Sequence, residues 1–240
     1  MADSKRIVIP VFDGVELLDV TGPMEILGNM DPTPEIYLVA EEPVWTVPKN
    51  ESLPKNLWFH LHPTTCYEDC PQADILMVPG GSGQVHKMFD PTYIGFLQAQ
   101  AEKAEYVTSV CTGALLLGAA GLLDGYLATT HWDSVSALNA FPEILVAPGY
   151  PRYVICGNRI TSGGVSSGID MALALVAVLY GDDAAKIVQM VTQYEPDPSF
   201  HSGNPDVAGP NIMGQAAALV NNLREERVQQ VQRIVQERLG

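Results

Sequence analysis

Apolar residues along the chain fall into short runs that alternate with helix-like patterns. Compact runs of β-branched and aliphatic residues predict buried strands, and longer stretches with apolar residues on one face predict helices. The expected strands are 5–12, 36–40, 59–61, 75–78, 106–110, 126–129, 153–155 and 159–162. The expected helices are 24–29, 93–105, 134–141, 167–180 and 183–194. Strands that alternate with helices in this way predict a doubly wound, mainly parallel α/β sheet flanked by helices.

The ends and interruptions of this pattern complete the predicted organisation. Residues 195–210 are rich in Pro, Asp, Ser and Gly and predict an ordered connecting loop. Residues 211–239 carry apolar positions at helical spacing and predict a C-terminal helix, packed on its own domain or across a dimer. The polar, Pro-containing stretch 46–56 suggests a hairpin or flap, and whether it gates a site stays open. We therefore expect a single domain over 1–240, with its core at about 5–194.

Composition and charge narrow the class of protein. The chain has 240 residues, of which 47% are hydrophobic, which suits one large α/β domain. A net charge of −15 argues against nucleic acid or an anionic membrane as a partner. No apolar stretch is long enough to span a bilayer or to act as a signal peptide. Four cysteines in a chain of this size suit a reducing compartment, so we expect a cytoplasmic protein.

The strongest chemical signal is Cys111, at the junction between the strand ending at Val110 and the apolar helix that follows. Small residues, Ser109 and Gly113, lie two positions to either side, which is the layout of a nucleophile elbow. A helix N-terminus directed at the cysteine favours a thiolate. A buried structural cysteine is the alternative, but the spacing favours a reactive, accessible thiol with a lowered pKa.

Two further strand ends offer groups that could act with this thiol. Gly80 and Gly81 follow the strand 75–78, and Gly80 is a candidate pocket residue. The backbone N–H groups of Gly81 and Thr112 are candidate donors to a developing negative charge. Asp19 lies at the first strand-to-helix crossover. It is either a catalytic acid or a helix N-cap, and the sequence leaves both open. Carboxyl ends of parallel strands meet at one edge of the sheet, so we expect these groups to share a site.

Other polar residues give weaker signals. His131 follows a short strand and could approach the site and line its pocket, although a structural role is the more common one for a histidine. Gly163, Gly164 and Ser166 precede the helix 167–180, where they could line a pocket or cap that helix. The histidines and cysteines between 60 and 70 match no standard zinc spacing, so we expect no metal site.

Six stretches together carry a resemblance to a known family. They are 18–23 (LDVTGP), 78–81 (VPGG), 109–113 (SVCTG), 128–132 (ATTHW), 162–170 (SGGVSSGID) and 194–205 (YEPDPSFHSGNP). In these the chain resembles the ThiJ/PfpI superfamily, and within it the isonitrile (isocyanide) hydratase branch. The resemblance implies a flavodoxin-like fold of the class I glutamine amidotransferase type, a homodimer and no cofactor.

The same resemblance implies a reaction and its residues. Cys111 is implied as the nucleophile, Asp19 as the acid and Thr112 as a neighbouring hydroxyl. The reaction would add water to an isonitrile through a covalent thioimidate and release an N-substituted formamide. Which isonitrile is accepted stays open.

Other functions known among similar proteins fit the sequence less well or stay open. Protease-like relatives carry His directly after the nucleophile, where this chain has Thr112. The C-terminal half contains no His-x-Glu pair, and this absence argues against a glutaminase. Related transcriptional regulators continue into a basic helix-turn-helix, which we do not expect before Gly240. A glyoxalase or deglycase activity, or a non-catalytic redox sensor that uses an oxidisable Cys111, remains as an alternative.

Overall fold

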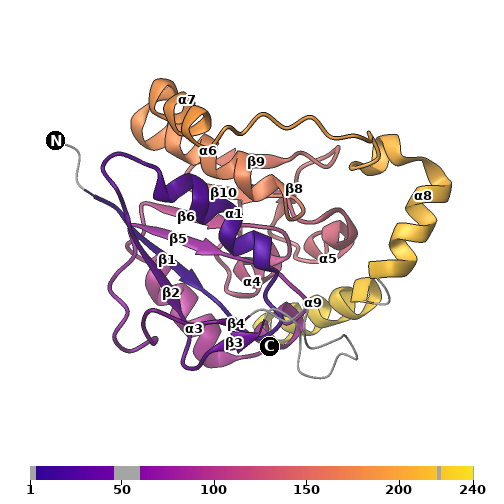
Figure 1. The fold of residues 1–240 in the computed structure, drawn as a ribbon. Coiled ribbons are helices and arrows are strands. Elements are labelled where there is room, and N and C mark those ends of the chain that lie inside the picture. Colours follow the sequence, from indigo (N-terminus) through magenta and orange to yellow (C-terminus); the bar gives the residue numbers. More distant parts are fainter. Residues whose placement is uncertain (1–3, 46–59, 221–222, 240) are drawn as a thin grey trace.

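The computed structural model describes residues 4–45, 60–220 and 223–239 and contains one central sheet between two layers of helices (Figure 1). The sheet has six strands in the order β2-β1-β5-β6-β10-β9. Their bounds are β1 Arg6–Pro10, β2 Glu35–Val39, β5 Ile75–Val78, β6 Tyr106–Ser109, β9 Tyr153–Cys156 and β10 Arg159–Ser162. All neighbouring pairs are parallel except β9 with β10. The predicted doubly wound, mainly parallel sheet is confirmed.

Two small sheets account for the remaining strands. β7 (Leu127–Ala128) pairs in parallel with β8 (Leu145–Val146), so the strand expected at 126–129 forms outside the central sheet. β3 (Val44–Trp45) pairs antiparallel with β4 (His60–Leu61). The hairpin or flap predicted at 46–56 lies outside the described residues.

The helices form one layer on each face of the sheet (Figure 1). One layer holds α1 (Leu17–Gly28), α6 (Ser167–Tyr180) and α7 (Asp182–Val191). The other holds α3 (Pro91–Ala101), α4 (Gly113–Ala119), α5 (Val135–Leu138) and α9 (Leu223–Leu239). A short helix α2 (Gln84–Lys87) and the 3-10 helix η2 (Trp132–Ser134) follow β5 and β7. The central strands between these layers are almost entirely buried.

Helix α1 begins at Leu17, well before the predicted start at residue 24, and includes Pro23 in its interior. The local pattern was misleading because proline usually marks the first turn of a helix. Here α1 packs on α6 so closely that a side chain at Gly22 would meet Ile169 Cγ1 at 3.1 Å. Burial of Val20 and Pro23 in this contact offsets the hydrogen bond that Pro23 cannot donate.

The C-terminal segment also differs from the prediction of one helix over 211–239 after a loop at 195–210. Helix α8 (Pro205–Val220) begins inside the expected loop, bends at Gly209 and buries none of its residues. Helix α9 then buries Val231 and Ile234 and packs against α4 and α5 of its own chain. Figure 1 shows the chain between α7 and α8 running over one end of the molecule, with α8 at its edge. Across the described residues, every helix is too short or too polar to cross a membrane.

Candidate active site

Cys111 lies at the turn between β6 and α4 with a positive φ of 57°. L residues other than glycine rarely adopt this conformation, which marks a strained strand-to-helix elbow. The Cys111 N–H holds the turn by donating to Ser162 O at 3.2 Å and Gly163 O at 3.0 Å. Gly113 is required at the next turn, because a Cβ there would lie 2.1 Å from Val78 O. The elbow geometry expected from the small-x-Cys-x-small spacing is present.

Asp19 lies in the first turn of α1 with its side chain fully buried beside the thiol. Its Oδ2 accepts a hydrogen bond from Gly80 N–H at 2.9 Å, and its Oδ1 has no partner within the described part of the chain. The N-cap of α1 is Glu16, so the N-cap interpretation of Asp19 is wrong. Burial raises the pKa of Asp19 to about 8, against the opposing effects of the Gly80 hydrogen bond and the Cys111 thiol. The carboxyl group is therefore mostly protonated at neutral pH.

The loop after β5 packs directly against this pair. A Cβ on Gly80 would lie 2.5 Å from both Thr112 N and Thr112 Oγ1 and 3.0 Å from Asp19 Oδ2, so only glycine fits. The N–H of Gly81 donates to Thr112 Oγ1 at 3.0 Å. Gly81 was expected to be a free donor for a developing charge, but the Thr112 hydroxyl already occupies its N–H. This hydroxyl thus fixes the loop to the elbow.

The Cys111 thiol is only 6% exposed, which corrects the expectation of an accessible thiol with a lowered pKa. Burial, followed by the nearby Asp19 carboxyl, raises the pKa of Cys111 well above its usual range. Backbone N–H groups of Val165 and Thr112 and the positive charge of Arg227 act in the opposite direction. The resting site therefore holds a thiol and a carboxylic acid side by side, both protonated at neutral pH.

Val165 supplies the second backbone donor to the sulfur, and the sequence analysis missed it. Its φ of 23° is unusual for a β-branched residue, so the backbone is strained where its N–H meets the thiol. The only signal in the sequence was the pair of glycines, Gly163 and Gly164, that precedes it. Position alone could not show which N–H group points at the sulfur.

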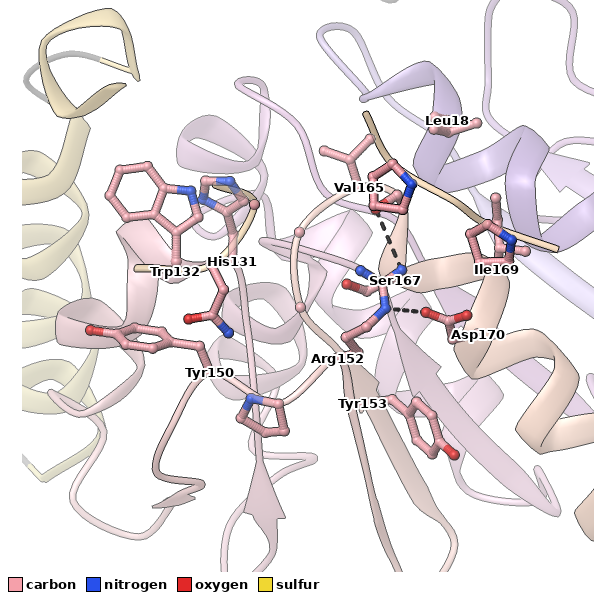
Figure 2. A pocket seen from close by; sticks show the side chains of 18 of the residues that line it. Leu18, His131, Trp132, Tyr150, Arg152, Tyr153, Val165, Ser167, Ile169 and Asp170 are labelled. Carbon is pink, nitrogen blue, oxygen red and sulfur yellow. Dashed lines mark hydrogen bonds and ion pairs between the residues drawn. The ribbon is translucent and has the colours of Figure 1, made fainter. Parts of the chain in front are cut away.

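A cavity of about 1380 Å³ lies next to the segment that contains Gly163, Gly164 and Val165, which are among its lining residues. Figure 2 shows His131 and Trp132 on one side of the cavity and Leu18, Val165 and Ile169 on the other. Of the residues predicted to line a pocket, His131, Gly163, Gly164 and Ser166 do so. Gly80 does not, because it packs behind Asp19 and Thr112.

Cys111 and Asp19 lie next to residues that line the cavity. Leu18 and Thr130 line the cavity, and the chain neighbour of Leu18 is Asp19. The hydroxyl of Thr130 donates to Cys111 O at 2.8 Å. Val165 also lines the cavity, and its N–H points at the sulfur, so two lining residues contact Cys111, although Cys111 and Asp19 do not themselves line the cavity.

His131 has a structural role and also lines the site. Its Nδ1 accepts the Asp133 N–H at 3.3 Å and so caps η2. Burial lowers its pKa to about 4, so the ring is neutral at physiological pH. A Cβ on Gly164 would lie 2.6 Å from His131 Cδ2, so the ring and the glycine backbone are in direct contact.

The outer part of the cavity combines apolar and aromatic surface with one ion pair. Arg152 contacts Asp170 (Figure 2), and the Tyr194 hydroxyl donates to the same carboxylate at 2.8 Å. Trp132 and Phe200 add aromatic surface. The ion pair leaves the charge of Arg152 neutralised. The segment 194–207, predicted only as part of a loop and helix, forms much of this wall.

The structure adds no metal centre to this site. Within 4–45, 60–220 and 223–239, no group of three or more His, Cys, Asp or Glu side chains is arranged to hold a metal ion. Cys66 and Cys70, from the cluster considered above, are free thiols, and so are Cys111 and Cys156.

Comparison with known proteins agrees with this geometry. The sequence profile described as the DJ-1/PfpI family matches residues 5–178. The chain is 43% identical over 206 residues to the isonitrile hydratase of Pseudomonas putida, which covers 86% of this chain and 86% of that protein. A crystal structure of a ThiJ/PfpI family protein from Pseudomonas syringae superposes with a TM-score of 0.83 at 32% identity, over 97% of this chain and 91% of that chain.

A second class of relative shares part of the chain. The HTH-type transcriptional regulator GbdR of Pseudomonas aeruginosa is 35% identical over 129 residues, which is 53% of this chain and 34% of the regulator. Because the regulator is matched over only about a third of its length, the similarity concerns one part of that protein.

Proposed function

The chain belongs to the DJ-1/PfpI family, and on that premise we propose that it is an isonitrile hydratase, a hydro-lyase that adds water to an isonitrile. The observation that carries the proposal is the buried Asp19 carboxyl, with its pKa raised to about 8, beside Cys111. Hydration of an isonitrile needs a nucleophile and a proton at the same carbon, and this pair supplies both. The 43% identity to the Pseudomonas putida isonitrile hydratase supports the same activity.

In the first step the terminal carbon of R–N≡C gains a proton and a sulfur atom. Asp19 donates its proton to that carbon and Cys111 sulfur bonds to it, while the thiol proton passes to the Asp19 carboxylate. The product is the thioimidate R–N=CH–S–Cys111, and Asp19 is protonated again. The N–H groups of Val165 and Thr112 stabilise the negative charge that develops on sulfur.

In the second step water adds across the C=N bond of the thioimidate. Asp19 donates its proton to the substrate nitrogen and accepts one from the attacking water, giving R–NH–CH(OH)–S–Cys111. Loss of the hydroxyl proton to Cys111 sulfur and cleavage of the C–S bond release R–NH–CHO. The thiol and the carboxylic acid are thereby restored, with one water consumed for each formamide.

The redox and protease-like alternatives fit this site less well. A redox sensor works through an exposed thiol with a lowered pKa, whereas Cys111 is buried and its pKa is raised. A glyoxalase or deglycase activity would also use Cys111 and the acid beside it, and the substrate test separates it from the hydratase. Thr112, fixed to Gly81, cannot serve as the base of a protease-like dyad.

We also propose a cytoplasmic homodimer. All four cysteines are free thiols, which suits a reducing compartment. Met190 on α7 is 78% exposed and Leu219 on α8 is 86% exposed, and apolar residues this exposed suit a contact with a second copy. Light scattering on the purified protein tests this part: a monomeric mass would refute the dimer.

The activity test uses purified protein with para-nitrophenyl isocyanide and follows formamide formation by absorbance. We expect turnover by the wild type, and loss of turnover in both Cys111→Ala and Asp19→Asn. Arg233→Gln, an exposed change on α9, serves as the matched control and should retain activity. If the wild type gives no formamide, the hydratase proposal fails, and methylglyoxal becomes the next substrate to test.

A further inference from the structure

Helix α9, which lies beyond the residues matched by the family profile, carries a buried arginine close to the site. Arg227 is only 6% exposed. Its Nη1 lies 3.5 Å from Asp133 Oδ2, and Arg224 Nη2 lies 2.7 Å from the other oxygen of the same carboxylate. Buried arginines are rare without a close partner, so this group calls for an explanation.

The charges in this cluster do not cancel. Two guanidinium groups share the single carboxylate of Asp133, which is itself 3% exposed. The side chains that accept further hydrogen bonds from Arg227 are neutral: it donates to Gln84 Oε1 at 3.3 Å and to Ser134 Oγ at 3.2 Å. The carboxylate of Glu226, its neighbour on α9, also interacts with Arg227, but Glu226 is exposed, so solvent screens its charge. Arg224 has a side chain that is 48% exposed, so solvent screens it, whereas the charge on Arg227 is shielded from water.

The partners of Arg227 belong to the two loops that flank Cys111. Gln84 follows the glycine loop that packs on Thr112, and Ser134 follows the turn that contains His131. That turn is joined to the elbow through the Thr130 hydroxyl, which donates to Cys111 O. Arg227 therefore joins both loops that flank the nucleophile.

We propose that Arg227 is a positioning residue of the site, whose unbalanced positive charge favours the negatively charged form of the Cys111 sulfur. Arg227 does not touch the substrate. It acts by holding the two loops in place through its hydrogen bonds and by the electrostatic effect of its positive charge on the Cys111 sulfur. In the reaction, this charge would assist sulfur attack on the isonitrile carbon, and that part rests on the proposed function.

The other charged groups around Cys111 explain why such a charge is needed. From α1, Asp19 faces the thiol, and once ionised its carboxylate raises the pKa of Cys111. Glu16, in the same turn, acts on Asp19 and raises the pKa of that carboxyl. From the β7–η2 turn, His131 is neutral. Arg227 is the positive group that opposes them, and it lowers the pKa of Cys111 while the cysteine raises that of Arg227.

The test measures thiol reactivity directly, so it does not depend on the substrate. The rate of Cys111 alkylation by iodoacetamide is followed from pH 6 to 11 by peptide mass spectrometry, which separates it from the other three cysteines. In Arg227→Gln we expect the apparent pKa of Cys111 to rise, so that alkylation at pH 8 slows severalfold, by up to about tenfold. Arg227→Lys should recover most of this loss, and Arg233→Gln should leave the profile unchanged.

A second variant predicts a change in the opposite direction. Asp133→Asn removes the carboxylate and leaves both arginines, so the apparent pKa of Cys111 should fall and alkylation at pH 8 should accelerate. Loosening of the loops alone would not produce opposite shifts in the two variants. If Arg227→Gln is folded by circular dichroism and keeps the wild-type pH profile, or if Asp133→Asn shifts it upward, the proposal is wrong. Because alkylation needs no isonitrile, failure of the hydratase assay would leave this result interpretable.

Discussion

Replacing Asp19 by Asn should abolish the proposed activity and at the same time stabilise the protein. Asn keeps the size of the side chain and an oxygen that can accept the Gly80 N–H, but it has no proton to donate to the isonitrile carbon. General acid catalysis is typically worth about 10²–10⁴ in rate, so we expect a loss in that range. Stability should rise because the variant no longer buries an ionisable group.

The size of the stability effect follows from the pKa of Asp19. It is about 8 in the folded protein against an ordinary value of 3.8, so at intermediate pH the folded state holds a proton that the unfolded state has lost. The wild type therefore loses stability as pH rises from about 4 to about 8, by at most about 1.4 kcal/mol per pH unit. At pH 7 the accumulated cost is on the order of 4 kcal/mol as an upper bound. Asn has no such cost at any pH.

Urea unfolding of the wild type and of Asp19→Asn at pH 5, 6 and 7 measures this directly. We expect the advantage of the Asn variant to grow by up to about 2.6 kcal/mol between pH 5 and pH 7. Cys111 does not interfere, because its thiol stays protonated in both states over this range. Glu102→Gln, at an exposed carboxylate, is the control and should show no such trend. A constant difference across the three pH values would mean that Asp19 is ionised in the folded protein, and the acid role would fall with it.

Three further outcomes are expected. Cys111→Ala should lower formamide production by at least about 10³-fold with the fold retained, and comparable turnover by this variant would exclude the covalent route. Gly164→Ala should displace the His131 ring and reduce kcat/KM about tenfold, because its Cβ would lie 2.6 Å from that ring, whereas Gly95→Ala, which points into open space, should be neutral. Leu173→Trp should narrow the cavity and lower kcat/KM for an aryl isonitrile by about 10- to 100-fold while methyl isonitrile changes little, and equal losses for both substrates would show that Leu173 does not contact the R group.

The location of the site follows from local patterns in the sequence. A β-branched run that ends in small-x-Cys-x-small specifies a strand, a sharp turn and a helix, and it places Cys111 at the turn. Parallel strands bring their carboxyl ends to one edge of the sheet, so Asp19 and the glycines after β5 were expected beside it. Both expectations concern element type and strand direction, which depend on short stretches of sequence.

The boundaries of some elements depended on tertiary contacts. Pro23 suggests a helix start, yet α1 begins earlier because its packing on α6 outweighs the cost of an internal proline. Likewise, Gly209 and Pro210 did not prevent α8 from beginning at Pro205, inside the stretch expected to be a loop. For α1 the packing on α6 outweighed the local preference of Pro23, whereas α8 buries none of its residues and keeps the break at Gly209 that its sequence favours.

The ionisation of the site was decided entirely by the tertiary structure. The spacing around Cys111 indicated a thiol with a lowered pKa, but the folded chain buries it behind Val165 and beside Asp19, and its pKa rises. Arg227, far along the chain on α9, carried no sequence signal because its neighbours form an ordinary amphipathic pattern. A pKa sums desolvation and charge over everything within several ångströms, and those groups come from distant parts of the chain. The sequence by itself thus determined which residues meet at the strand ends, and only the folded structure determined which of them hold protons.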